Sequence, residues 1–132
     1  MGKTVHDDLL DGALNILKNN GTRLCVCSAE PTTYNEAMTT YDGGAGKYKL
    51  AIKTISAADF TGPADGDVSG RKITVNQQAG VPVDATASAT HIAICDSVNS
   101  KLLLVTTCTS QPLTLGNTVT IPAFKEEYAD PT

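Results

Sequence analysis

The sequence predicts a mainly β fold in which an N-terminal amphipathic α-helix precedes an antiparallel, sandwich-like β domain. Apolar residues follow a helical period near the start of the chain. Short β-branched stretches separated by turn residues fill the remainder. The length of 132 residues is the third observation, because a chain of that size buries a workable core in a single domain without metals or disulfides.

The helix is predicted over residues 4–19. Asp7 and Asp8 fall in its first turn and Lys18 in its last, where each charge complements the helix dipole. Asn20 and Gly21 can take the left-handed conformation that ends many helices. The apolar residues at three- and four-residue spacing are Val5, Leu9, Leu10, Ala13, Leu14, Ile16 and Leu17, with Asp7, Asp11 and Asn15 opposite.

Six strands are predicted after Gly21, where the pattern changes to β-branched stretches between turn residues. A short edge segment is added at 81–84, because Pro82 has no amide proton to give to a ladder. The six predicted strands are 22–28, 48–56, 71–76, 90–96, 101–107 and 118–124.

Strands 90–96 and 101–107 are predicted to form a hairpin. The residues that join them, 96–100, have the length and composition of a hairpin turn. Side chains alternate along a strand, so one of the two faces of 90–96 is expected to be core. The two faces are Ile92 and Ile94 on one side, and His91, Ala93 and Cys95 on the other.

Two long loops are predicted to contact partners. The first, 31–46, ends in a glycine-rich run and is expected to hold a short helical turn at 34–38. The second, 59–70, is rich in Gly, Pro and Asp. Loops of that length in a compact domain are usually functional surfaces or become ordered on binding. The proposed contact residues in the two loops are Pro31, Tyr34, Tyr41, Asp65 and Asp67.

The last residues, 125–132, are predicted to form an extended arm, because they have no apolar period. Glu126 and Glu127 would point to opposite sides of it and solvate it. Such an arm, with Tyr128 as a contact residue, would lie on a neighbouring subunit or fray. The single domain, 1–132, then consists of a helix at 1–21, a β domain at 22–124 and the arm.

The composition argues against two kinds of partner. A formal net charge of -4 gives no basic surface for phosphates, so nucleic acid is not expected. No long apolar run exists, and charged residues interrupt the start of the chain, so neither a membrane span nor a signal peptide is expected. His6 stands where a myristoylation signal needs Ser or Thr, which argues against a lipid anchor.

The four cysteines, Cys25, Cys27, Cys95 and Cys108, are candidates for covalent or metal chemistry. Residues two apart on a strand point to the same side, so Cys25 and Cys27 could converge on one partner. Neither cysteine pair has the two-residue gap of a structural zinc knuckle, and free cysteine is commonly buried. Packing is therefore the favoured interpretation. Disulfides within the domain or between subunits, and a metal site, remain the alternatives.

No convergent catalytic set stands out in the sequence. His91 with Cys25 or Cys27 is the one nucleophile and base pair that can be proposed, and no motif supports it. Asp65-Gly66-Asp67 lacks the spacing of a calcium loop, and the glycine-rich run before Lys47 lacks the pattern of a phosphate-binding loop. We therefore expect no catalytic residue, no metal and no cofactor.

Several motifs resemble, in order and spacing, a family of small structural proteins carried by tailed bacteriophages and prophages. The resemblance spans nearly the whole chain, apart from an apparent glycine-rich expansion at 42–47. The motifs that carry it are Val5-His6-Asp7-Asp8-Leu9-Leu10-Asp11, Cys25-Val26-Cys27-Ser28-Ala29-Glu30-Pro31-Thr32-Thr33-Tyr34, Ser69-Gly70-Arg71-Lys72, Ala89-Thr90-His91-Ile92-Ala93 and Lys101-Leu102-Leu103-Leu104-Val105-Thr106-Thr107-Cys108.

The resemblance implies a non-enzymatic virion protein, made in the cytoplasm of the host bacterium. We expect a capsid decoration or cementing protein that binds the major capsid lattice and copies of itself. A neck, collar or tail component is the alternative. A receptor- or carbohydrate-binding module is the alternative from another class, although such sites usually carry exposed aromatics and this chain has no Trp.

Overall fold

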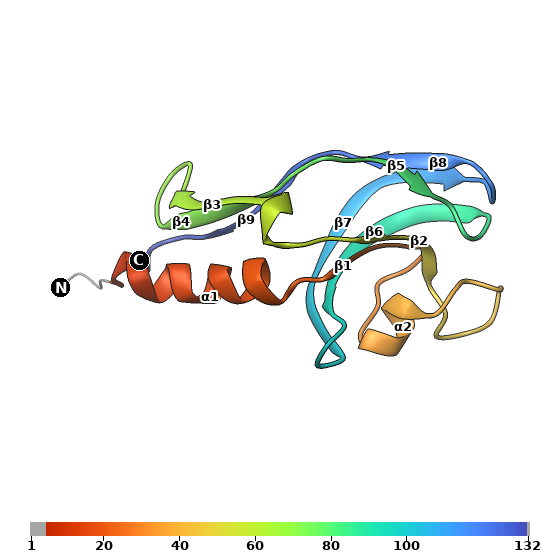
Figure 1. Ribbon diagram of the computed structural model, residues 1–132, viewed down its shortest axis with the longest axis horizontal. Helices are drawn as coiled ribbons and strands as arrows, with labels where there is room; N and C mark the ends of the chain where they lie inside the picture. Colours follow the sequence, from red (N-terminus) through yellow and green to blue (C-terminus); the bar gives the residue numbers. More distant parts are fainter. Residues whose placement is uncertain (1–4, 132) are drawn as a thin grey trace.

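A computed structural model describes residues 5–131 and confirms the predicted fold class (Figure 1). An N-terminal helix is followed by antiparallel sheets in a sandwich-like arrangement. The sheets contain four, three and two strands. One large apolar cluster of residues from the helix and all three sheets forms the main core.

Helix α1 (Asp7–Asn20) begins three residues later than predicted, and Thr4 lies outside the described residues. His6 has an extended backbone and caps the helix, because its Nδ1 accepts from the Asp8 amide at 3.1 Å. The predicted apolar side of the helix is divided. Leu14 and Leu17 are buried, whereas Leu9 and Ile16 are 70% and 55% exposed.

Gly21 ends α1 in a different way from the one predicted. Its backbone is extended, with φ −72° and ψ 106°, and not left-handed. A Cβ at this position would lie 2.6 Å from the Leu17 carbonyl oxygen and 2.9 Å from Ile94 Cγ2. Glycine is therefore needed here for the close approach of the helix end to the sheet.

The four-stranded sheet has the order β2-β1-β6-β7. Its strands are β1 (Arg23–Cys27), β2 (Lys49–Thr54), β6 (Ala87–Asp96) and β7 (Lys101–Leu113). The predicted hairpin is confirmed as β6 and β7, which pair antiparallel around a turn that Asp96 stabilises through the amides of Val98 and Asn99. Both strands are longer than predicted, and β7 continues to Leu113.

Both faces of this sheet are buried, and not one face as predicted. Ile92 and Ile94 face the main core, and Ala93 and Cys95 are covered on the other side. The cover comes from the excursion after β1, whose short helix α2 (Tyr34–Met38) coincides with the predicted helical turn. Thr33 caps α2, because its hydroxyl accepts from the Glu36 amide at 3.2 Å.

The three-stranded sheet, in the order β3-β4-β9, lies against α1 at the left of Figure 1. Its strands are β3 (Phe60–Asp65), β4 (Arg71–Val75) and β9 (Phe124–Tyr128), and the short 3-10 helix η1 (Ala57–Asp59) leads into it. Two predictions are wrong here. Half of loop 59–70 is an edge strand, and the start of the C-terminal arm pairs with β4 along its whole length.

The two-stranded sheet pairs β5 (Gln78–Pro82) with β8 (Thr118–Ile121). β5 replaces the predicted edge segment and begins earlier. A bridge between Ala51 and Val83, with a 2.7 Å hydrogen bond from the Asp84 amide to the Leu50 carbonyl, joins this pair to β2. In the described part of the chain, no helix is long and apolar enough to cross a membrane.

Candidate functional site

A cleft of about 560 Å³ opens between β7 and β8. Buried side chains of the main core form its floor, among them Val26, Ile92 and Ile121. Polar uncharged side chains such as Thr109 and Asn117 stand among its other lining residues. The cleft wall, as residues 5–131 form it, contains neither a charged nor an aromatic side chain.

The cleft exists because β7 and β8 are consecutive strands that do not pair with each other. The Asn117 amide donates to the Thr114 carbonyl at 3.0 Å and closes a tight turn between them. The Gly116 amide donates to the Val83 carbonyl at 3.2 Å, which draws the turn toward β5. β7 then pairs with β6, and β8 with β5. Such a site can hold an uncharged, extended segment. Its one titratable side chain among the described residues is Cys108, and burial raises the pKa of that thiol.

The predicted contact residues of the first loop pack against the body of the protein. Pro31 is buried, Tyr34 packs on the cluster beneath α2, and Tyr41 packs on the main core. None of the three lines the cleft. These three side chains therefore hold the loop against the body of the molecule, while residues 42–45 of the loop are exposed.

Asp65, Asp67 and the C-terminal strand form a network of charges. Asp65 accepts from Arg71 Nη1 at 2.7 Å. Asp67 pairs with Lys72 at 2.5 Å and with Lys125, while its amide donates to Glu127 at 2.7 Å. Arginine and lysine side chains of the protein itself thus pair with both aspartates. Tyr128, which is 39% exposed, pairs with Arg71 across the β4–β9 ladder.

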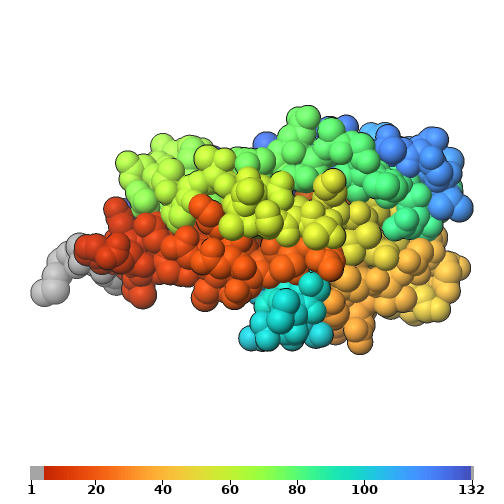
Figure 2. Space-filling model, viewed as in Figure 1, coloured from red at the N-terminus to blue at the C-terminus, as the bar shows by residue number. Residues whose placement is uncertain are grey.

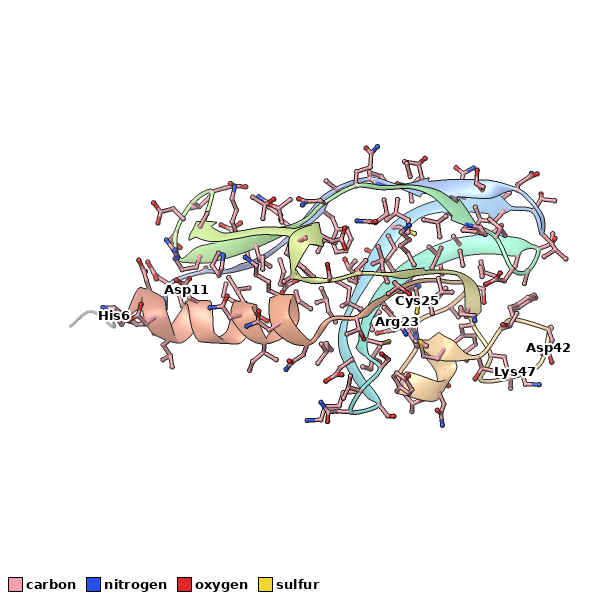
Figure 3. The ribbon with its side chains drawn as sticks, in the orientation of Figure 1. His6, Asp11, Arg23, Cys25, Asp42 and Lys47 are labelled. Carbon is pink, nitrogen blue, oxygen red and sulfur yellow. The ribbon has the colours of Figure 1, made fainter. Side chains whose placement is uncertain are left out.

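All four cysteines are free thiols in the structure, which favours packing over a disulfide within the domain. Cys25, Cys27 and Cys95 are fully buried beneath α2, where the Cys25 thiol donates to Met38 Sδ at 3.6 Å (Figure 3). Cys108 lies on the opposite face, packs on the main core and lines the cleft. Within residues 5–131, no group of three or more His, Cys, Asp or Glu side chains is placed to hold a metal.

The proposed pairing of a cysteine with His91 does not produce an activated thiol. Cys27 lies opposite His91 in the β1–β6 register, but burial raises the pKa of Cys27 to about 12. Interaction with the Cys95 thiol, followed by burial, raises the pKa of Cys25. Thr90 donates to the Ser28 carbonyl at 3.0 Å, so its oxygen accepts the 2.8 Å hydrogen bond from His91 Nδ1. The His91 ring is thus held in place through Thr90 and the Ser28 carbonyl.

Glu126 is a feature that the sequence did not predict. It lies opposite fully buried Ile73 in the β4–β9 register, on the face that α1 covers, and burial raises its pKa. Its neighbour Glu127 lies on the other face and accepts from the Asp67 amide. The two carboxylates that were expected to solvate an arm therefore have different environments.

We predict that Glu126→Gln raises Tm at pH 7.5. A carboxyl group whose folded pKa is raised destabilises the fold as pH rises through that pKa, because the unfolded state then holds the charge at lower cost. The gain over wild type should shrink toward pH 4, as the unfolded state also becomes protonated. Thermal unfolding followed by circular dichroism from about pH 4 to pH 8 measures this difference.

Glu127→Gln is the matched control for this experiment. It weakens the contacts with the Asp67 amide and Lys125, so Tm should fall at neutral pH. Equal changes in the two variants, or a gain for Glu126→Gln that does not depend on pH, would contradict the assignment.

Comparison of the chain with protein-family models, with curated proteins and with solved structures found no match. The site must therefore be interpreted from its own residues. The cleft was not predicted, although one signal was present. The run from Leu102 to Leu113 contains no charged residue and is longer than the strand predicted within it.

Proposed function

We propose that this chain is a non-enzymatic structural protein of a tailed-bacteriophage particle. Within that class, it decorates or cements the capsid by binding the major capsid lattice. The observation that carries the proposal is the sequence resemblance, whose motifs span nearly the whole chain. In the structure, residues of these motifs build the framework. Arg71 links β4 to α1, and Cys25 and Cys27 pack beneath α2.

The cleft between β7 and β8 supports this proposal as a contact surface. A neutral, partly apolar groove suits an extended segment of a neighbouring protein better than it suits a charged small molecule. Carbohydrate sites usually provide aromatic side chains for stacking, and the cleft wall has none within the described residues. We therefore favour the structural role over the binding-module alternative.

The experiment is quantitative mass spectrometry of purified particles from a phage that encodes this protein. A copy number near that of the major capsid protein supports decoration, whereas a few copies per particle supports the neck, collar or tail alternative. Absence from the particle overturns the structural role. Gel electrophoresis with and without reductant should show no cross-link through Cys25, Cys27 or Cys95, since all three are buried.

A further inference from the structure

β7 is the outer strand of the four-stranded sheet, and no strand of the described chain pairs with its outer edge. An open edge presents unpaired amide and carbonyl groups, which form a template for another strand. The edge is also long, because β7 extends over 13 residues. The turn that joins it to β6 projects from the body of the molecule in Figure 2.

The first half of β7 has the composition of an interior strand. Four consecutive apolar residues, Leu102 to Val105, lie beside the edge, and each is partly exposed. Leu103 and Leu104 pack on the main core, and Leu102 and Val105 pack on the cluster beneath α2. A strand that is apolar on both faces is typical of the middle of a sheet, where neighbours cover both sides. Here one neighbour is missing.

The other edges of the described sheets are protected. β2 has Lys49 and Lys53, and the chain at Thr40 and Val83 bridges to the same strand. Charged residues and proline interrupt the edges of the three-stranded sheet, namely Pro63 in β3 and Lys125, Glu126 and Glu127 in β9. β8 has four residues and β5 ends at Pro82. Lysine, proline and short strands are the usual devices against edge pairing, and β7 lacks them from Leu102 to Gln111.

We propose that the outer edge of β7 is a self-association surface, where β7 of a second copy pairs antiparallel and joins the two four-stranded sheets. An added strand must present apolar side chains to both layers, and β7 itself has this pattern. In the antiparallel register centred on this run, Leu102 to Val105 lie against the same four residues of the partner, and Lys101, the one charge of the strand, lies against the uncharged Thr106. The same surface on both chains gives a closed two-fold dimer. This interface does not depend on a role in a virion.

The experiment is size-exclusion chromatography with light scattering on the full chain, with Thr107→Lys as the test variant. Thr107 is exposed on β7, and a lysine on an edge strand opposes pairing. We expect wild type to have twice the 13.7 kDa chain mass and the variant to have the chain mass. Thr54→Lys is the matched control, because Thr54 is exposed on β2 at the opposite edge, and it should remain dimeric.

Amide hydrogen exchange across residues 101–111 gives a second readout. Exchange there should be slow in wild type and faster in Thr107→Lys, while β1 stays protected and the far-ultraviolet circular dichroism is unchanged. A monomeric wild type at high protein concentration overturns the proposal. So does a Thr107→Lys protein that is folded and still dimeric, or a Thr54→Lys protein that dissociates equally.

Discussion

Replacing Gly70 by alanine is expected to displace β9 from β4 and to lower the free energy of unfolding by about 3 kcal/mol. Gly70 has a φ of +70°, which other residues rarely adopt. An added Cβ would overlap the Tyr128 carbonyl oxygen and lie 2.8 Å from Ala129 Cα. These are backbone atoms and cannot move aside as a flexible side chain would. Urea denaturation followed by circular dichroism measures the loss.

Gly80→Ala is the matched control for this substitution. Gly80 also has a positive φ, of +66°, but a Cβ there would meet nothing within 4 Å. Its replacement should cost about 1 kcal/mol, from backbone strain alone. Limited proteolysis adds a direct test, because the C-terminal residues after Ile121 should be cut faster in Gly70→Ala than in Gly80→Ala. Equal stability of the two variants would show that β9 does not approach Gly70 closely.

The strands that sequence patterns missed lie at the edge of the three-stranded sheet. The pattern Lys125-Glu126-Glu127 is typical of a solvated tail, but β9 is ordered by its ladder with β4 and by ion pairs. The Gly62-Pro63 pair in β3 is typical of a turn, and the β3–β4 register does shift between Thr61 and Ala64. Edge strands tolerate such residues because one side needs no hydrogen bonds. Local composition alone therefore could not identify them.

Elements that depend on residues close together in the sequence were predicted well. The turn residues at 96–100 produce the hairpin of β6 and β7, and the helical turn at 34–38 is α2. The burial of both faces of β6 could not be predicted, because it depends on where the excursion after β1 folds back. The cleft is also non-local, since it requires that β8 pair with β5 and leave β7 open. Sequence alternation sets the two faces of a strand but not what covers each of them.

Arg71→Ala is expected to loosen α1 from the three-stranded sheet and to lower Tm by roughly 5–10 °C. Arg71 Nε donates to Asp11 Oδ1 at 2.7 Å, and Nη2 donates to Asp11 Oδ2 at 3.3 Å. Nη1 donates to Asp65 at 2.7 Å and lies 3.9 Å from Asp7. The hydrogen bond with Asp11 raises the pKa of Arg71, so the guanidinium stays charged over the whole working range of pH.

The size of the effect follows from the environment of the pair. The Arg71 and Asp11 side chains are 17% and 22% exposed, so removal of the arginine leaves a partly buried carboxylate without its bidentate partner. Lys47→Ala is the control, because the Lys47–Asp42 pair has a similar distance of 2.8 Å but 43% and 54% exposed side chains (Figure 3). Exposed pairs contribute little, so Tm of that variant should change by less than about 2 °C.

Arg71→Lys separates geometry from charge. Lysine keeps the positive charge but cannot donate the fork of hydrogen bonds to Asp11, so its Tm should lie between those of wild type and Arg71→Ala. Thermal unfolding at low salt and at about 1 M NaCl completes the comparison, because screening weakens exposed pairs far more than shielded ones. If Arg71→Ala and Lys47→Ala were equally mild, α1 would be held by its other contacts, among them buried Leu14 and Leu17 and the hydrogen bond from Lys18 to the Gly62 carbonyl, and the bidentate pair would have no part in fixing it to the sheet.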